Sequence, residues 1–241
     1  MGSTVLTNCR IWMGGYELSG QLNSIGIDYG AELLDDTVFG TGGTRSNKPG
    51  LKTLTINGGG FWDDELDGAI YARIGADREV VSVSPTGFTE GDRVYFTRAV
   101  NGSYNPLSGA VGELLSFELD FHNSDCQLVR GVILGTGQKT VSGVGAAFNL
   151  GPVLPLHLCY GALHVKDPVG TGGTLDVVIE SSPDNTFAAA QTRLTFPQVT
   201  DTIGGSWDEQ VGPIADTWWR AKWTITGAGA LYPLHISFGI L

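Results

Sequence analysis

The sequence predicts an all-β fold with one short helix, and three observations lead to this prediction. Glycine supplies 36 of the 241 residues, without the three-residue period of collagen. Charged residues make up only 16% of the chain, and no long segment has the apolar spacing of an amphipathic helix. Apolar and polar residues instead alternate along several short segments. Together these features predict antiparallel sheets in a sandwich or a barrel.

The alternation is clearest in four segments that are expected to be strands: 113–121, 175–180, 219–225 and 234–240. In the first of them the predicted buried positions are Leu115, Phe117, Leu119 and Phe121. The polar residues between them, Ser116, Glu118 and Asp120, are expected to face water.

The later strands carry most of the tryptophans. Trp219 and Trp223 share one face of their strand and are expected to be core. Trp218 points to the opposite face and is a candidate for an exposed contact. By the same alternation, Asp176 and Glu180 are expected on the solvent side.

One helix is predicted, beginning after Asp63. Asp63 is a suitable N-cap, and three further acidic residues follow within the first turn, where the helix dipole favours them. Leu66, Ile70 and Ile74 are spaced four apart and would form its buried face.

Glycine-rich stretches at 57–60, 101–102 and 170–174 are expected to be turns between strands. A polar run at 123–126 ends a strand and suggests two domains, 1–125 and 126–241. The charge also changes there. Residues 1–125 hold 17 acidic and 8 basic side chains, net −9, and the remainder holds 8 and 6, net −2. No basic stripe is present that could neutralise nucleic-acid phosphates.

The stretch 30–50 is expected to be a long loop, a feature that is usually functional in a compact domain. Leu33, Leu34, Val38 and Phe39 are too apolar to remain in water, so they are expected to pack either on their own domain or on a neighbouring subunit.

No catalytic or metal-binding pattern is found, so an enzyme, a cofactor and a metal site are not expected. The paired carboxylates Asp35–Asp36 and Asp63–Asp64 are best explained as solvated or capping charges. His157, Cys159 and His164 could form a partial metal site, but neighbours on one strand is the favoured explanation. No secretion signal is seen at 1–4 and no apolar run is long enough for a membrane helix, which favours assembly in a cytoplasm without a membrane anchor.

Four segments of the first half resemble tail tube (major tail) proteins of long-tailed bacteriophages: 27–40 (IDYGAELLDDTVFG), 44–56 (TRSNKPGLKTLTI), 61–63 (FWD) and 111–115 (VGELL). The resemblance covers about half of the chain. It departs from the family's pattern at residues 41–43, where the loop is longer. The second half, including 175–187, resembles β-sandwich domains that are appended to some phage virion proteins.

The resemblance implies a tail-tube-like β domain followed by a second β-sandwich. It also implies hexameric rings that stack into a tube, through which DNA passes without specific binding. Self and other tail or head proteins would be the partners, and the virion tail the location. The stretch 30–50 would then reach a neighbouring subunit through seven candidate contact residues: Leu33, Leu34, Asp35, Asp36, Phe39, Arg45 and Lys48.

Two other functions remain open. A capsid decoration protein or other virion structural protein would use a similar β domain without a channel. A carbohydrate-binding module would attach residues 126–241 to a host surface, with Trp218 as the candidate contact.

Overall fold

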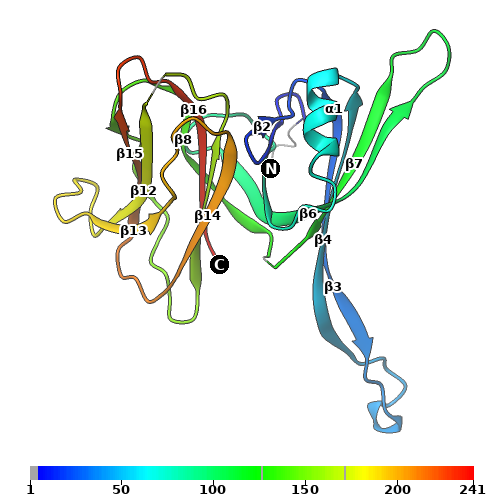
Figure 1. The fold of residues 1–241 in the computed structure, drawn as a ribbon. Coiled ribbons are helices and arrows are strands. Elements are labelled where there is room, and N and C mark those ends of the chain that lie inside the picture. The colour runs from blue at the N-terminus through cyan, green and yellow to red at the C-terminus, as the bar shows by residue number, and fades with distance from the viewer. Residues whose placement is uncertain (1–4, 126, 171) are drawn as a thin grey trace. The chain divides into compact units, whose positions relative to one another are not determined.

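The computed structural model describes residues 5–125, 127–170 and 172–241 (Figure 1). Residues 1–4, Cys126 at the predicted boundary and Thr171 in a predicted turn lie outside the described residues. Over the described ranges the fold is all-β with one α-helix, as predicted from the sequence. Among the described residues, no helix is long and apolar enough to cross a membrane.

The chain forms two compact units, and neither is continuous in sequence. Unit 1 consists of the described residues up to Gly20, Glu79–Arg98 and Val129–Leu241, and unit 2 consists of Gln21–Arg78 and Ala99–Leu128. The chain therefore passes from one unit to the other four times, and one of these crossings lies close to the predicted boundary. The division into domains 1–125 and 126–241 stays a prediction.

Unit 1 contains two antiparallel sheets. The first has the strand order β14-β11-β16-β8-β6-β5-β1-β2, where strand β6 (Arg93–Ser108) belongs to this unit only up to Arg98. The bounds of its other strands are β1 (Arg10–Met13), β2 (Tyr16–Glu17), β5 (Glu79–Ser84), β8 (Val129–Lys139), β11 (Leu158–Val165), β14 (Gly204–Val211) and β16 (Tyr232–Ile240). Strand β5 contacts β11 and β14, so this sheet curls upon itself.

The second sheet of unit 1 has the order β10-β15-β12-β13, with β9 also pairing with β15. Its strands are β9 (Gly143–Val144), β10 (Phe148–Asn149), β12 (Thr174–Ser182), β13 (Gln191–Thr195) and β15 (Trp218–Thr226). The core between the sheets includes Trp219, Trp223 and Phe238, and the Trp219 and Phe238 rings stack at 4.6 Å. The prediction that Trp219 and Trp223 are core is confirmed.

One polar position on β12 was predicted wrongly. Glu180 is only 4% exposed, where alternation places it in solvent. Strand β12 stays in register with β15, so Glu180 still lies on the face of Arg220 and Lys222, and it is buried because these two side chains cover its carboxylate. Arg220 and Lys222 both donate to the Glu180 carboxylate. Burial by itself raises the pKa of this carboxyl group, but the two cations outweigh it and hold the pKa below its usual value.

Unit 2 is a four-stranded antiparallel sheet with the order β3-β4-β7-β6 and one helix. Its elements are β3 (Leu22–Asp35), a 3-10 turn η1 (Phe39–Thr41), β4 (Asn47–Phe61), α1 (Asp64–Tyr71), the part of β6 from Ala99, and β7 (Ser116–Asn123). Asp63 caps α1 as predicted, because its carboxylate accepts from the Leu66 amide. Leu66 and Ile70 are buried, but α1 ends at Tyr71, so the exposed Ile74 does not belong to its buried face.

Two glycine stretches predicted as turns lie inside strands of unit 2. Asn57–Gly60 lies in the last part of β4, where this strand pairs with both β3 and β7, and Asn101–Gly102 is at a register shift within β6. The reason is close approach between strands. A Cβ atom at Gly60 would lie 2.2 Å from the Gln21 carbonyl oxygen, and one at Gly102 would lie 2.5 Å from the His122 ring.

Candidate functional site

The sheet of unit 2 has two unlike faces. On one face, buried apolar side chains come from β4 and β7: Leu54, Ile56, Phe117, Leu119 and Phe121. Tyr104 of β6 lies on this face beside Phe117, and its hydroxyl donates to Asp67 of α1 at 2.8 Å. Burial, and then the hydrogen bond to Asp67, raises the pKa of Tyr104. The helix therefore covers the apolar face.

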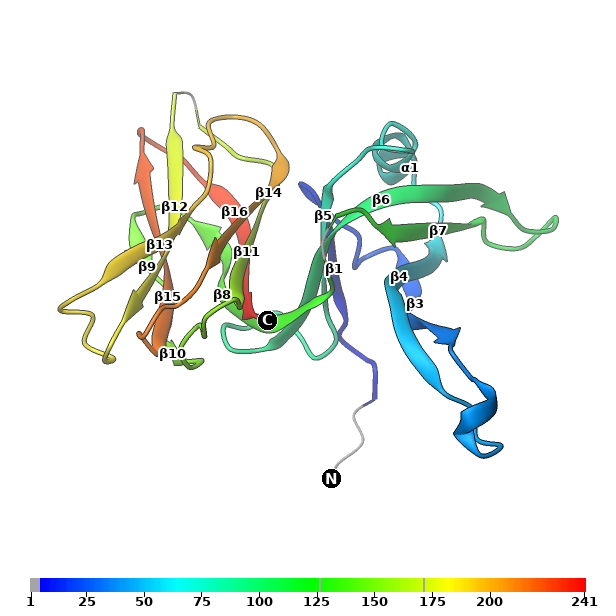
Figure 2. The ribbon, with the colours of Figure 1, turned by 90° about the horizontal axis from the view of Figure 1, so that it is seen from below.

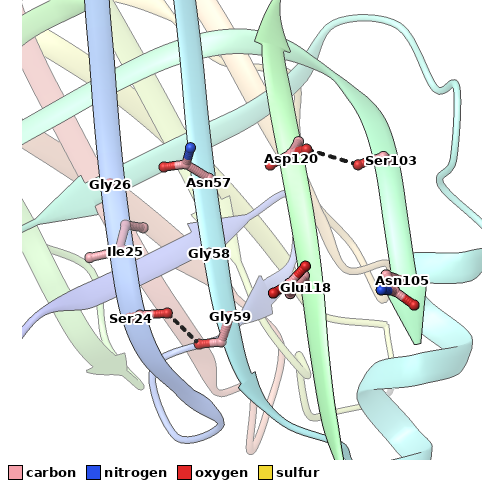
Figure 3. Close-up of a pocket in the computed structure, with 10 residues that line it drawn as sticks. All are labelled: Ser24, Ile25, Gly26, Asn57, Gly58, Gly59, Ser103, Asn105, Glu118 and Asp120. Atoms are coloured by element: carbon pink, nitrogen blue, oxygen red, sulfur yellow. Dashed lines mark hydrogen bonds between the residues drawn. The ribbon is translucent and has the colours of Figure 1, made fainter. Parts of the chain in front are cut away.

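The opposite face is polar and acidic, and we call it the polar face (Figure 3). It lines an open cavity of about 540 Å³ with residues from all four strands: Ser24, Ile25, Gly26, Asn57, Gly58, Gly59, Ser103, Asn105, Glu118 and Asp120. The lining contains two carboxylates and no Lys or Arg. Strand register places Asp28, opposite Thr55, on the same face. The prediction that Glu118 and Asp120 face away from the core is confirmed.

Few interactions hold the polar face in place. Ser103 donates to the Asp120 carboxylate at 3.0 Å, and Ser24 donates to the Gly59 carbonyl at 3.3 Å (Figure 3). Gly26 leaves room for the Asn57 side chain on this face, because a Cβ atom at Gly26 would lie 2.4 Å from that side chain. Short polar groups and carboxylates without cations form a surface that repels an anion instead of binding it.

Strands β3 and β4 continue beyond the sheet as a hairpin, which we call arm 1 (Figures 1 and 2). The stretch 30–50 is therefore not all loop: pairing extends from Leu22–Gly60 to Asp35–Asn47, and only residues 36–46 form the tip. Leu33 pairs with Pro49 and Leu34 with Lys48, so the two leucines point to opposite faces of a two-stranded ribbon. A ribbon with apolar groups on both faces cannot bury them within itself.

The apolar side chains of arm 1 are exposed. Leu33 is 70% exposed, Leu34 is 48% exposed, and Phe39 at the tip is fully exposed. Val38 and Leu51 are exposed on the same arm. Of the two expectations for this stretch, packing on the remainder of its own unit is thus wrong for these residues. Contact with a neighbouring subunit stays a prediction.

The charged candidates on arm 1 mostly hold the tip together. Asp36 and Lys48 form an ion pair at 2.9 Å, and Asp35 accepts from the Thr37 amide at 2.9 Å. Hydrogen bonds from Thr37 lower the pKa of Asp35, and those from Ser46 and then Lys48 lower that of Asp36. Arg45 is exposed near the tip. Among the charged candidates, Arg45 is therefore the one best placed to contact another molecule.

A second hairpin, arm 2, connects β6 to β7 (Figure 2). It contains residues 111–115, which were singled out for their resemblance to tail tube proteins, but a projecting hairpin was not predicted there. Leu107, Val111 and Leu114 are exposed along it, and Leu115, predicted to be buried, is also exposed. Glu113 closes its tip by accepting from the Ala110 amide. A signal for a turn here is present in the sequence, because the turn-forming glycines Gly109 and Gly112 lie among large apolar residues.

Both outer strands of the unit 2 sheet have a free edge. Among the described residues, β3 pairs only with β4, and the Ser103–Ser108 part of β6 pairs only with β7. Strand β3 is 14 residues long. A long free edge presents unpaired backbone donors and acceptors to any strand that can reach it.

The remaining sequence candidates do not join this site. Trp218 is half-buried on β15 of unit 1, and its role as a contact stays a prediction. Cys159 and His164 lie on β11, and His157 precedes this strand. Within the part of the chain that the structure describes, no group of three His, Cys, Asp or Glu side chains could hold a metal ion.

No protein-family model and no curated protein sequence matches the chain. Solved structures do. A chain from the "virion of native gene transfer agent (GTA) particle" is 16% identical with a TM-score of 0.44, covering 52% of this chain and 98% of that one. A chain from the "tail of empty GTA particle", solved with C6 symmetry, is 20% identical with a TM-score of 0.37, covering 45% and 81%. The SPP1 Dit protein, described as a paradigm of the hub adsorption apparatus in phages that infect Gram-positive bacteria, is 10% identical with a TM-score of 0.39, covering 98% and 100%. In each case the chain is similar to a protein of a virion, a tail or an adsorption apparatus.

Proposed function

We propose that this chain is a structural subunit of a phage tail tube, and that it forms stacked hexameric rings around a channel that conducts DNA. The observation that carries the proposal is the construction of unit 2: one sheet with a covered apolar face, an acidic open face and two free edges, extended by two arms with exposed apolar residues. The resemblance of residues 27–56 to tail tube proteins supports the ring.

The free edges account for ring formation. Strand β3 of one copy pairs with the Ser103–Ser108 part of β6 in the next, which satisfies the backbone groups that each edge leaves open. Repetition of this pairing around an axis closes the sheet and removes its edges. A closed sheet of this kind has one face toward its axis and one face outward. Because α1 covers the apolar face, the polar face lines the channel.

The charge of the polar face suits passage of DNA. Glu118, Asp120 and Asp28 carry the same sign as the phosphates, and no Lys or Arg lies among the lining residues. A duplex is therefore held away from the wall and forms no strong contact that would slow it. This role needs no catalytic group, and the chain acts as a non-enzymatic structural protein of the virion tail.

The arms account for contacts between subunits. Leu33, Leu34 and Phe39 are the apolar anchors of arm 1, and the exposed Arg45 is the charged residue that we expect to contact a neighbouring subunit. Asp35, Asp36 and Lys48 keep the tip in shape so that the anchors are presented correctly. Burial of these anchors against a neighbouring ring or subunit stabilises the stack by about 1.5–3 kcal/mol for each fully buried side chain.

Electron microscopy of the purified chain tests the proposal. We expect rings or tubes, and we expect the double variant Leu33→Asp, Phe39→Asp to remain folded but unassembled, because both side chains are exposed in the free chain. The control is Leu156→Asp, which changes a highly exposed apolar residue in the same way but belongs to unit 1. This control should still assemble.

Four outcomes contradict the proposal. Monomers at every concentration contradict assembly itself, and assembly that is unchanged by the double variant contradicts the role of arm 1. Single rings that never stack place the chain elsewhere in a virion, and trimers favour the capsid decoration alternative.

A further inference from the structure

Two cations of unit 1 lie together without a carboxylate beside them. Nine Lys and Arg side chains belong to unit 1, and seven of them lie within 4.0 Å of a carboxylate. The other two are Arg93 of β6 and Arg130 of β8, both exposed, whose guanidinium groups have no ion pair or hydrogen bond within the described residues. Arg93 pairs with Val132 and Arg130 with Tyr95, so the two arginines are diagonal neighbours on one face of the sheet. Like charges at this spacing repel each other unless an anion lies between them.

Both arginines line a cavity of about 150 Å³ that belongs to unit 1 alone. Its other walls are mainly apolar and include Leu150 and Ile240, which are only half-buried and can therefore be reached from outside. The cavity is smaller than the range of about 300–1,000 Å³ that is typical of small-molecule sites. A volume of about 150 Å³ holds a group of the size of benzene, so this cavity can take one side chain.

These walls suit the side chain of a glutamate. Its carboxylate can accept from both guanidinium groups, because arginine presents its donors in a planar fork that matches a carboxylate. Its two methylene groups can pack against Leu150 and Ile240. Aspartate has one methylene group fewer and phosphate has none, so each would leave more of the apolar wall uncovered.

One glutamate of unit 2 is placed to enter a cavity on another molecule. Glu32 is exposed on arm 1, and its carboxylate has no hydrogen bond or ion pair within the described residues. It lies at a bulge, between Ala31, which pairs with Lys52, and Leu33, which pairs with Pro49. A bulge turns a side chain out of the regular alternation of its strand. Glu32 also stands beside Leu33, one of the proposed anchors.

The three other glutamates of unit 2 are less suited to this role. Glu113 accepts from the Ala110 amide at the tip of arm 2, and Glu118 lies on the polar face. Glu65 lies in α1, which covers the sheet and does not project from it. Glu32 is therefore the glutamate of unit 2 that combines a projecting hairpin with an unpaired carboxylate among the described residues.

We propose that Glu32 of one copy enters the cavity at Arg93 and Arg130 of a second copy. The inference rests on the proposed assembly and adds the surface that receives arm 1. The carboxylate offsets the repulsion between the two arginines. The apolar wall takes this contact partly out of water, where salt screens an ion pair less.

Charge reversal tests the contact. Glu32→Arg and Arg130→Glu each replace a residue that is exposed in the free chain, so both variants should fold, with an unchanged urea midpoint as the check. Each variant should raise the concentration needed for assembly at least about tenfold, because like charges then meet at the contact. Sedimentation velocity measures that concentration.

A mixture of the two variants shows which molecules are in contact. Equal amounts of the Glu32→Arg chain and the Arg130→Glu chain should assemble as the unaltered chain does, because each arm finds a cavity of suitable charge on the other variant. A contact within one chain could not be restored by mixing. A single chain with both changes should also assemble.

Glu65→Arg and Lys166→Glu are the matched controls. They make comparable charge changes in unit 2 and in unit 1, on solvent-accessible residues outside arm 1 and outside the cavity. Both should assemble as the unaltered chain does.

The inference is overturned if either charge reversal leaves assembly unchanged, if the mixture does not restore assembly, or if the controls lose assembly to the same extent. In each of these cases, rings or tubes of the unaltered chain still support the proposed function. Monomers of the unaltered chain at every concentration overturn both. Failure of the inference is therefore distinguishable from failure of the proposed function.

Discussion

His164 and His235 face each other across strands β11 and β16 in unit 1, with ring centroids 5.7 Å apart. The Gly14 carbonyl can only accept, so His164 Nδ1 donates to it at 2.7 Å. Neutral His164 then accepts from the Ser82 hydroxyl at Nε2, also at 2.7 Å. Burial lowers the pKa of His164 to about 4. Burial, and then the neighbouring His164, lowers that of His235.

Unit 1 should lose stability on mild acidification for this reason. Unfolded histidine has a pKa of about 6.5, so the unfolded chain binds the proton first as the pH falls. The contribution of His164 is complete above about pH 6.5 and is lost progressively toward about pH 4, with about 2 kcal/mol lost by about pH 5. Urea unfolding at about pH 7.5 and about pH 5 measures the loss.

The variant His235→Phe provides the control for this measurement. It keeps an aromatic ring beside Trp12 and Phe88 and removes one titrating group. Its loss of stability between the two pH values should be smaller. If His235→Phe and the unaltered chain lose the same stability between the two pH values, the loss comes from carboxyl groups and not from the histidines.

At the scale of elements, strands with clear alternation were predictable and strands rich in glycine were not. The segments at 175–180, 219–225 and 234–240 lie in β12, β15 and β16. They were predictable because a strand with one buried face has an apolar residue at every second position. Three of the four residues in Asn57–Gly60 are glycines, so no alternation of apolar and polar side chains can be seen and the local pattern indicates a turn. Its place in β4 depends on β3 and β7, which lie elsewhere in the sequence.

Gly60 should tolerate no side chain for this reason. In Gly60→Ala the new methyl group would meet backbone atoms of Gln21 and Leu22, which cannot move without breaking strand pairing. We expect a loss of about 1–3 kcal/mol in the free energy of unfolding, measured in urea.

Gly30→Ala is the matched control in the same unit. Nothing lies within 4 Å of a Cβ at Gly30, so its stability should change by less than about 0.5 kcal/mol. Equal effects of the two substitutions would mean that the close approach at Gly60 does not constrain the strand.

The arms show what the sequence could and could not predict about the candidate site. The apolar residues of arm 1 were recognisable, because four large side chains in a polar stretch need a partner. Its ribbon structure was not, since two bulges interrupt the register between β3 and β4. Arm 2 was missed because residues 113–115 continue the alternation of the strand that follows, so the turn marked by Gly109 and Gly112 was not separated from that strand.

At the scale of the whole molecule, the acidic charge is concentrated in unit 2. This unit holds 13 acidic and 5 basic residues, net −8, and unit 1 holds 12 and 9, net −3. The two halves of the sequence show a similar difference, net −9 against net −2, because most of unit 2 lies in the first half. Most of the excess charge is therefore in the unit that carries the polar face and the arms.

Reversal of charge on the polar face tests the proposed tube. Tubes of the unaltered chain, as proposed, should not retain duplex DNA in a sedimentation assay. Tubes of Glu118→Lys, Asp120→Lys should retain it at low salt and release it as salt is added, because the new contacts are to phosphates.

The same charge change made elsewhere is the control. Asp64→Lys, Glu65→Lys alters exposed residues of α1 by the same amount. Tubes of this variant should retain little DNA. If they retain as much as the polar-face variant, the polar face is not the surface that DNA meets.

The discontinuous units have a consequence for synthesis on the ribosome. Unit 2 ends at Leu128, so all of its strands have been made while 113 residues of unit 1, from 129 to 241, are still to come. At about 5–20 residues per second this delay is about 6–23 s. The free edge of β3 and both arms are thus available to neighbouring nascent chains before unit 1 is complete. Subunits made on the same messenger RNA are close enough to meet during that interval.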